Sequence, residues 1–335
     1  MTVTTIPGII SAVATWRTAA AIACAVAVFS FTASAQGDLR TPWGDPDLQG
    51  IWPSGQLMQV PFERPASFGV RAELTDAEFQ RLAASLQQQQ KADAEEFSRG
   101  GGAGVNPPSH WLENGRPSRQ ASLIVDPPDG RLPPMTEDGA RRAKAWPSTN
   151  PAVPYASAQE FNIYDRCITR GVLGSTMPNI YNSGIEIMQA PGLVVIRYEM
   201  IHETRIIPLD GRPHAGPAIR SYMGDARGRW EGRTLVVETT NFNGRTGSLA
   251  RNGNGNPTSE ALRLTERFTR RDAETLDYSV TVDDPRTWTR PWRVAFSLNR
   301  DRDYTMYEYA CHEGNYAIAN ILRGFRAAEQ AGQAR

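Results

Sequence analysis

Residues 193–207, with the sequence LVVIRYEMIHETRII, decide how this chain folds. Side chains along a β-strand point alternately to its two faces, so every second residue shares a face. One face carries Val194, Ile196, Tyr198, Met200, His202, Thr204 and Ile206. The other carries Val195, Arg197, Glu199, Ile201, Glu203, Arg205 and Ile207. We predict that the first face packs into the core, with His202 among apolar side chains, and that the charged second face meets water.

Similar runs recur through the last third of the chain, separated by short turn sequences. They predict strands at 185–189, 234–241, 261–270, 275–282, 292–298 and 304–311. The sequence at 190–192 would close the first hairpin, and glycines predict turns at 210–211 and 228–232. Short strands with short connections favour an antiparallel meander. We therefore predict a mainly β fold, built as an antiparallel barrel or strongly curled sheet, which is lipocalin-like by analogy.

Three carboxylates fall on or beside apolar faces of these strands, namely Glu238, Glu266 and Asp284. An ionised carboxylate inside a sheet core costs free energy unless it is paired. Several of them on one surface predict a polar cavity suited to acid–base chemistry. The alternative is that these carboxylates pair with Arg197, Arg263 or Arg290 or lie at a sheet edge. A register shift of one residue would turn them outward.

The chain contains four histidines, and His202 is the first candidate for catalysis. Its ordinary pKa allows it to act as a general base near neutral pH. Glu238 or Glu266 would be the partner acid or would orient the histidine, and Tyr198 and His312 would stabilise developing charge. The alternative for His202 is a hydrogen-bonded core histidine, and for His312 a place in a helix N-terminus.

Other polar residues are candidates for substrate binding. His214 lies in a loop rich in proline and glycine, where it would form the rim of a pocket or be a plain loop residue. Asp284, Tyr278 and Tyr309 would supply polar anchors or a stacking surface. The tyrosines favour an uncharged aromatic, terpenoid or sugar-like ligand.

The first 35 residues have the features of a signal peptide. Arg17 provides a positive charge, residues 19–31 form a short apolar run, and Ala33-Ser34-Ala35 matches a cleavage site. The run is too short to span a bilayer. We predict a periplasmic or secreted protein without a membrane span after cleavage.

Residues 36–160 are predicted to form an irregular arm, rich in proline and glycine, that wraps the β domain. A capping box of Thr75 and Glu78 starts a helix at about 75–97, and a shorter helix is predicted at 136–146. Trp43 and Trp52, in or near the segment 45–52, are the predicted docking anchors.

The β domain is predicted to cover residues 161–330 and to end in an amphipathic helix from Asn315. The apolar face of this helix carries Ile318, Ile321, Leu322 and Phe325. Cys167 and Cys311 are the two cysteines that follow the signal peptide, and an exported chain with an even number favours a disulfide between them. The alternative is two free buried thiols.

The charge balance excludes some classes of protein. The chain has 36 basic and 36 acidic residues and no basic run, which argues against nucleic-acid binding. No dinucleotide-binding or phosphate-binding glycine motif follows a strand, and no Gly-x-Ser-x-Gly motif occurs. The histidines lack metal-ligand spacing. We predict no metal or other cofactor, and the sequence gives no indication of oligomeric state.

Three phrases carry a resemblance to a family of exported bacterial proteins of uncharacterised function. They are DARGRWEG at 225–232 followed by TLVVETTNF at 234–242, YEYACHEGNY at 307–316, and the stretch 200–214. The resemblance implies export and a β-rich body. It carries over no reaction.

Together these features predict a periplasmic enzyme that acts on a small organic substrate by acid–base chemistry. A lyase, dehydratase or isomerase is favoured, followed by a hydrolase. One alternative is a lipocalin-like carrier in which the same polar residues anchor a ligand. The other is a structural envelope protein whose inward acids are salt-bridged.

Overall fold

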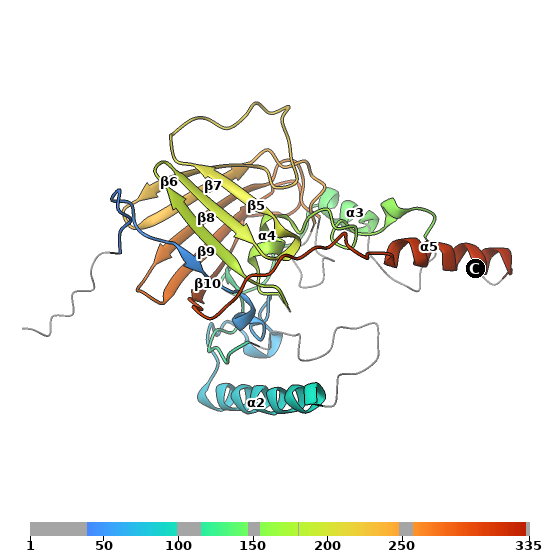
Figure 1. Ribbon diagram of the computed structural model, residues 1–335, viewed down its shortest axis with the longest axis horizontal. Coiled ribbons are helices and arrows are strands. Elements are labelled where there is room, and N and C mark those ends of the chain that lie inside the picture. Colours follow the sequence, from blue (N-terminus) through green and yellow to red (C-terminus); the bar gives the residue numbers. More distant parts are fainter. Residues whose placement is uncertain (1–38, 99–114, 147–154, 180, 248–256, 333–335) are drawn as a thin grey trace, which may run out of the picture. The chain divides into compact units, whose positions relative to one another are not determined.

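The computed structural model describes residues 39–98, 115–146, 155–179, 181–247 and 257–332. The signal peptide predicted for residues 1–35 lies outside the described residues. The described elements belong to one structural unit, Arg40–Arg335. This unit is mainly β, with two antiparallel sheets and, in the described ranges, four α-helices (Figure 1).

The larger sheet has six strands in the order β2-β10-β9-β8-β7-β6. Its strands are β2 (Ile124–Asp126), β6 (Asp225–Glu231), β7 (Thr234–Thr240), β8 (Arg263–Arg270), β9 (Thr275–Asp283) and β10 (Trp292–Asn299). Figure 1 shows β6 to β10 side by side. The strands predicted at 234–241, 261–270, 275–282 and 292–298 are confirmed. Alternation between buried and less buried residues marks β8, β9 and β10, whereas β7 buries three consecutive residues, 235–237.

Strand β6 lies where the glycines predicted a turn at 228–232. Only Gly232, with a φ of 60°, is in the turn. Gly228 lies within the strand, where the residue is glycine because the other sheet comes very close to it. A Cβ at this position would lie 2.5 Å from a methyl group of Leu209 and 2.8 Å from one of Ile207. The glycine therefore marks close sheet packing.

The smaller sheet has the order β1-β3-β4-β5. Its strands are β1 (Gly50–Ile51), β3 (Ile185–Ala190), β4 (Leu193–Tyr198) and β5 (Thr204–Pro208). Pairing of β1 with β3 and full burial of Trp52 confirm that the arm docks through 45–52. Trp43 is 37% exposed, so the prediction that it is an anchor is wrong.

The single strand predicted at 193–207 is wrong. It is a hairpin, with β4 and β5 joined by a 3₁₀ turn at Met200–His202. Ile201 and His202 have φ values of 59° and 47°, which end the strand. The alternation restarts beyond the turn in the opposite phase. Arg205 is therefore buried and His202 is exposed, the reverse of the prediction.

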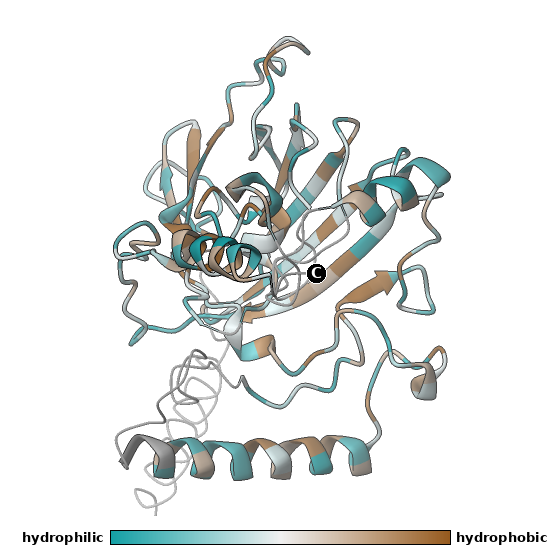
Figure 2. Cartoon of the chain, turned by 90° about the vertical axis from the view of Figure 1, so that its right-hand side faces the viewer, coloured by the Kyte–Doolittle hydropathy of each residue, from teal (hydrophilic) through white to brown (hydrophobic). Residues whose placement is uncertain are grey.

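The core lies between the inner faces of the two sheets. Leu264, Phe268, Tyr278 and Val280 from the larger sheet and Ile196 from the smaller one belong to one buried cluster. Figure 2 shows the alternation behind it as brown and teal bands along the strands. Strands β5 and β6 adjoin, but each is the last strand of its own sheet. No closed barrel is found among the described strands.

The helices are α2 (Asp76–Ser98), α3 (Glu137–Ala145), α4 (Gly171–Thr176) and α5 (Ala317–Gln330). The helices predicted at 75–97, at 136–146 and at the C-terminal end are confirmed, whereas the short α4 was not predicted. The capping box is present, since Glu78 accepts a hydrogen bond of 2.8 Å from the Thr75 amide. No helix in the described ranges has the length and apolar character needed to cross a membrane.

Candidate functional site

A cleft of about 690 Å³ lies where three chain segments meet. Tyr164, Tyr181 and Tyr309 line it, one from each segment, and we name it the tyrosine cleft. Its remaining lining residues are Phe161, Asp165, Glu308, Ala310, Cys311, Glu313, Gly314, Asn315, Ala317, Ile318 and Ile321. The described lining includes acids but no lysine, arginine or histidine. The cleft therefore combines aromatic walls with an acidic rim.

The disulfide between Cys167 and Cys311 holds two of these segments together, as predicted. Its Cα atoms are 5.6 Å apart. Asn315 reinforces the junction by donating a hydrogen bond of 3.4 Å to the Asp165 carbonyl. Tyr164 lies three residues before one cysteine and Tyr309 two residues before the other. The disulfide thus brings both rings to the same cleft.

The phenol groups interact directly. The hydroxyls of Tyr164 and Tyr181 are 3.0 Å apart, and the rings of Tyr181 and Tyr309 stack with centroids 6.3 Å apart and planes at 25°. Burial raises the pKa of both Tyr164 and Tyr309, and the neighbouring Tyr181 adds to the rise. Like an ordinary tyrosine, both are protonated at neutral pH and can donate hydrogen bonds to a ligand.

A buried cation lies behind the tyrosines. The Arg170 guanidinium carbon is 4.8 Å from the centre of the Tyr164 ring, a cation–π contact. Burial lowers the pKa of Arg170, and Tyr164, Tyr181, Tyr309 and Glu203 partly offset that effect. The five groups thus share one electrostatic environment. A positive charge beside neutral phenols favours a negative charge developing on a bound oxygen.

Glu203 is the carboxylate of this group. It accepts hydrogen bonds from the Thr169 hydroxyl at 2.5 Å and from the Arg170 amide at 3.4 Å. Burial nevertheless raises the pKa of Glu203 above its ordinary value. Its charge state is therefore closer to a change near neutral pH than that of an exposed glutamate.

The backbone around the cleft is strained. Five non-glycine residues of the described chain have φ between 47° and 60°. Four of them are Cys167, Asn182, Ile201 and His202, in segments that carry or touch the three tyrosines. Ile201 is β-branched, so its left-handed conformation is costly. Strain of this kind concentrates at functional sites.

Glu199 fixes the segment that carries Tyr309. It accepts hydrogen bonds from the Tyr304 hydroxyl at 2.7 Å, the Tyr307 amide at 3.1 Å and the Asn182 side chain at 3.0 Å. The strand predicted at 304–311 is wrong, because this segment bonds to a side chain and joins neither sheet. Glu199 instead holds it beside the cleft.

His202 contacts a residue of the cleft but does not line the cleft itself. Its Nδ1 lies 3.0 Å from the Tyr309 carbonyl oxygen. A carbonyl only accepts hydrogen bonds, so Nδ1 carries the proton and Nε2 is the basic nitrogen of the neutral ring. The ring is exposed and not in the core, which corrects the prediction of its burial.

Glu266 and Tyr198 are buried as predicted, but they lie apart from the tyrosine cleft. Arg205 donates to Glu266 at 3.0 and 2.5 Å and to the Tyr198 hydroxyl at 3.1 Å, while Tyr278 donates to Glu266 at 3.1 Å. We name these four residues the inner network. Burial raises the pKa of both tyrosines. Neither charged member lines the tyrosine cleft.

The other predicted acids hold the fold together. Glu238 shares a face with Val236 as predicted, but it is the outer face, where Glu238 accepts from Arg229 at 2.8 Å. Asp284 is buried and accepts from the hydroxyls of Ser259 and Thr287, both at 2.6 Å. Glu238 and Glu266 each pair with an arginine, but with Arg229 and Arg205 and not with Arg197, Arg263 or Arg290. Asp284 instead closes a turn.

The remaining predicted residues lie apart from one another. His214 is half-buried, with Nδ1 3.1 Å from Asp225. Hydrogen bonds from Ala215 and Arg227 lower the pKa of Asp225 against the effect of burial. His312 is exposed, next to the disulfide. His202, Glu238, Glu266 and His312 therefore do not meet in one hollow.

Of the predicted catalytic and substrate-binding residues, only Tyr309 lines the cleft, together with Cys311 of the predicted disulfide. Sequence reasoning missed Tyr164, Tyr181, Arg170 and Glu203. A signal for Tyr164 existed, since the predicted disulfide places it near Tyr309. The described ranges contain no group of three or more His, Cys, Asp or Glu side chains arranged for a metal ion. Comparisons of the chain with family models, curated proteins and solved structures found no match.

Proposed function

We propose that this protein is an enzyme that acts on a small organic molecule by proton transfer, with the tyrosine cleft as its substrate site. One observation carries the proposal: phenols from three chain segments meet at one cavity, and burial raises the pKa of two of them. A cavity of this size is typical of small-molecule sites. Perturbed titratable groups in a cleft are typical of active sites.

The favoured reaction class is that of a lyase, dehydratase or isomerase. Neutral tyrosines donate hydrogen bonds to an oxygen as it becomes negative, and the nearby Arg170 charge supports them. Nε2 of His202 is the proposed base, because the Tyr309 carbonyl fixes its tautomer. Glu203, with its raised pKa, is the second candidate for this role.

The lining of the cleft also favours a class of ligand. Asp165, Glu308 and Glu313 would repel an anion, while the rings of Phe161 and the tyrosines suit a planar or hydroxylated surface. An uncharged aromatic, terpenoid or sugar-like substrate fits both features. The disulfide supports the proposal that the chain is exported to an oxidising compartment. The proposal also includes a lipocalin-like arrangement, in which the two adjoining sheets close into a barrel.

Proton exchange provides the direct test. The protein would be incubated in deuterated water with a panel of cyclic, aromatic and hydroxylated ketones, and exchange next to the carbonyl followed by NMR. We expect the wild type to accelerate exchange for at least one of them. Tyr309→Phe should slow that exchange about 100-fold, the usual cost of losing one donor to an oxyanion.

A matched control uses the neighbouring Tyr307, which is 71% exposed. Tyr307→Phe removes a hydroxyl from the same segment and should leave exchange unchanged. Binding of a panel member without exchange would favour the carrier alternative. The cleft would lose its proposed role if the wild type neither bound nor exchanged any of these ketones.

A further inference from the structure

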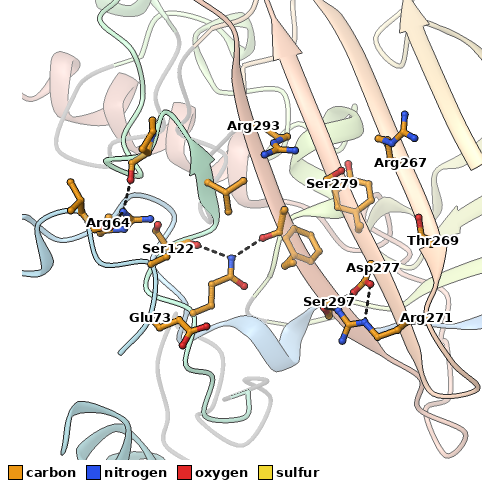
Figure 3. A pocket seen from close by; sticks show the side chains of 18 residues that line it. Arg64, Glu73, Ser122, Arg267, Thr269, Arg271, Asp277, Ser279, Arg293 and Ser297 are labelled. Carbon is orange, nitrogen blue, oxygen red and sulfur yellow. Dashed lines mark hydrogen bonds and ion pairs between the residues drawn. The ribbon is translucent and has the colours of Figure 1, made fainter. Parts of the chain in front are cut away.

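A second cavity, of about 760 Å³, lies on the outer face of β8, β9 and β10. Arm residues from 64–73 and 120–128 form its opposite wall (Figure 3). Four arginines line it, namely Arg64, Arg267, Arg271 and Arg293, and we name it the arginine groove. It is lined by none of the residues of the tyrosine cleft.

Small polar side chains form the floor of the groove. Arg267 pairs with Ser279 across β8 and β9, and Ser279 pairs with Ala295 across β9 and β10. Thr269 and Ser297 both pair with Asp277. These residues share the outer face, since paired residues point to the same side of a sheet. The short side chains are those of Thr269, Ser279, Ala295 and Ser297. They leave a hollow between the longer arginines, and three of them line it with hydroxyl groups.

Two of the arginines already have carboxylate partners. Arg271 donates to Asp277 at 2.9 and 2.5 Å, and Ser297 donates to the same carboxylate at 2.7 Å. Arg267 donates to Glu231 at 2.9 Å. These pairs shape the groove but offer little free charge to a ligand.

The other two arginines have no carboxylate partner within the described ranges. Arg293 is exposed, and its side chain makes no hydrogen bond or ion pair there. Arg64 is only 3% exposed, and its Nη1 donates to the carbonyls of Val70 at 3.0 Å and Pro128 at 2.6 Å. Its buried Nε has no partner. A buried guanidinium held only by carbonyls is costly unless an anion approaches it.

The arm is fitted to this buried arginine. Gly130 has a φ of 69°, and a Cβ there would lie 2.8 Å from the Arg64 Cβ and 2.9 Å from its guanidinium carbon. Gln120 uses both amide hydrogens, donating to the carbonyls of Ser122 and Ala295 at 2.7 Å each. Its Oε1 is therefore left to accept a hydrogen bond from a ligand.

We propose that the arginine groove binds a carboxylated sugar chain. Arg64 and Arg293 supply positive charge from opposite walls, suited to carboxylates. The floor hydroxyls and Gln120 suit the hydroxyl groups of a sugar. Glu73 and Asp277 also line the groove and would repel a densely charged anion such as a phosphate cluster. A polyhydroxylated ligand with sparse negative charge satisfies all of these features.

Calorimetric titration with a galacturonic acid hexamer tests the proposal. We expect saturable binding by the full protein at low salt, weakening as salt is added. Arg293→Ala should weaken binding about tenfold, because it removes one charge-assisted contact. It should fold normally, since the side chain is exposed. Arg302→Ala is the matched control, because it removes an exposed arginine outside the groove that pairs with Glu274, and it should bind like wild type.

Two further probes separate the possible ligands. A neutral maltose hexamer should not bind, and inorganic phosphate should compete poorly with the acidic hexamer. Equal binding of the neutral chain would overturn the role of charge, and equal competition by phosphate would overturn the role of the sugar. Absence of hexamer binding, or an Arg293→Ala variant that binds as tightly as wild type, would overturn the proposal as a whole.

Discussion

Two clusters in this chain combine tyrosines, an arginine and a glutamate, and they differ in access to solvent. The inner network contains Arg205, Glu266, Tyr198 and Tyr278 between the two sheets, and Glu266 has no exposed surface. The tyrosine cleft has Arg170 and Glu203 behind it and an open volume of about 690 Å³ in front. The residue types are the same in both.

Burial raises the pKa of tyrosines in both clusters, so a perturbed pKa does not tell them apart. The difference lies in what the polar atoms face. In the inner network Glu266 neutralises Arg205 at close range, and neither side chain lines a cavity described above. In the cleft the phenols face open space beside a strained backbone. Access, and not titration, indicates which cluster can act on a ligand.

The largest expected effect comes from breaking the inner network. Glu266→Ala should lower the free energy of unfolding by about 3–5 kcal/mol, because it leaves Arg205 buried without a counter-charge. Urea denaturation measures this change. The double variant Arg205→Met with Glu266→Leu should recover most of the loss, since apolar side chains can replace a buried ion pair.

An exposed pair provides the control for that experiment. Glu274 pairs with Arg302 on the surface, and Glu274→Ala should change stability by no more than about 0.5 kcal/mol. If Glu266→Ala remained as stable as wild type but lost ketone exchange, Glu266 would be catalytic, and the distinction between the two clusters would be wrong.

A smaller effect is expected from the disulfide. Replacing Cys167 and Cys311 together by serine opens a link between residues 144 positions apart, and should cost about 2–4 kcal/mol in unfolding free energy. Because the link holds Tyr164 beside Tyr309, ketone exchange should fall even at temperatures where the variant is folded. Urea denaturation and the NMR assay measure the two effects. Unchanged exchange in a folded variant would show that the cleft does not need this link.

The smallest expected effect is alkaline destabilisation. Because burial raises the pKa of Tyr164 above its ordinary value of 10.0, the unfolded chain loses the phenolic proton before the folded chain does. The free energy of unfolding should therefore fall as the pH rises above about 10. Tyr164→Phe should reduce this fall, and urea denaturation between pH 8 and pH 11 measures it.

Ultraviolet absorbance over the same pH range follows the ionisation of the buried tyrosines. Tyr164, Tyr198 and Tyr278 should all ionise only as the protein unfolds, because burial raises the pKa of each. Tyr316→Phe, at a residue that is 71% exposed, is the control and should not alter the alkaline loss of stability. Ionisation of the inner tyrosines in the folded protein would mean that water reaches the inner network.

The sequence predicted those elements in which a local pattern matches burial. Strands β7 to β10 follow from their apolar patterning, helices α2, α3 and α5 from capping and apolar faces, and the disulfide from cysteine number. The errors occur where local signals conflict with long-range contacts. Gly228 resembles a turn residue but allows one sheet to approach the other, and Tyr307 resembles a strand residue but bonds to Glu199.

The candidate site shows the same division. The burial of Glu266, Tyr278 and Asp284 followed from strand phase, and all three are buried. A polar hollow around all three did not follow, because Tyr278 and Arg205 both donate hydrogen bonds to Glu266, while Asp284 accepts from Ser259 and Thr287 elsewhere. His202 was placed wrongly because two left-handed residues break the alternation. No periodic pattern indicates such a break.

The sequence by itself determined the mainly β character and the helix starts, because strand period and capping act over a few residues. It also determined the pairing of Cys167 with Cys311, because these are the two cysteines that follow the predicted signal peptide. Only the tertiary structure decided which cluster stays closed and which opens to a cleft. That choice depends on how segments from 161–179, 181–182, 199–203 and 304–315 pack together. A cavity is a property of the space between such segments, and no one of them encodes it.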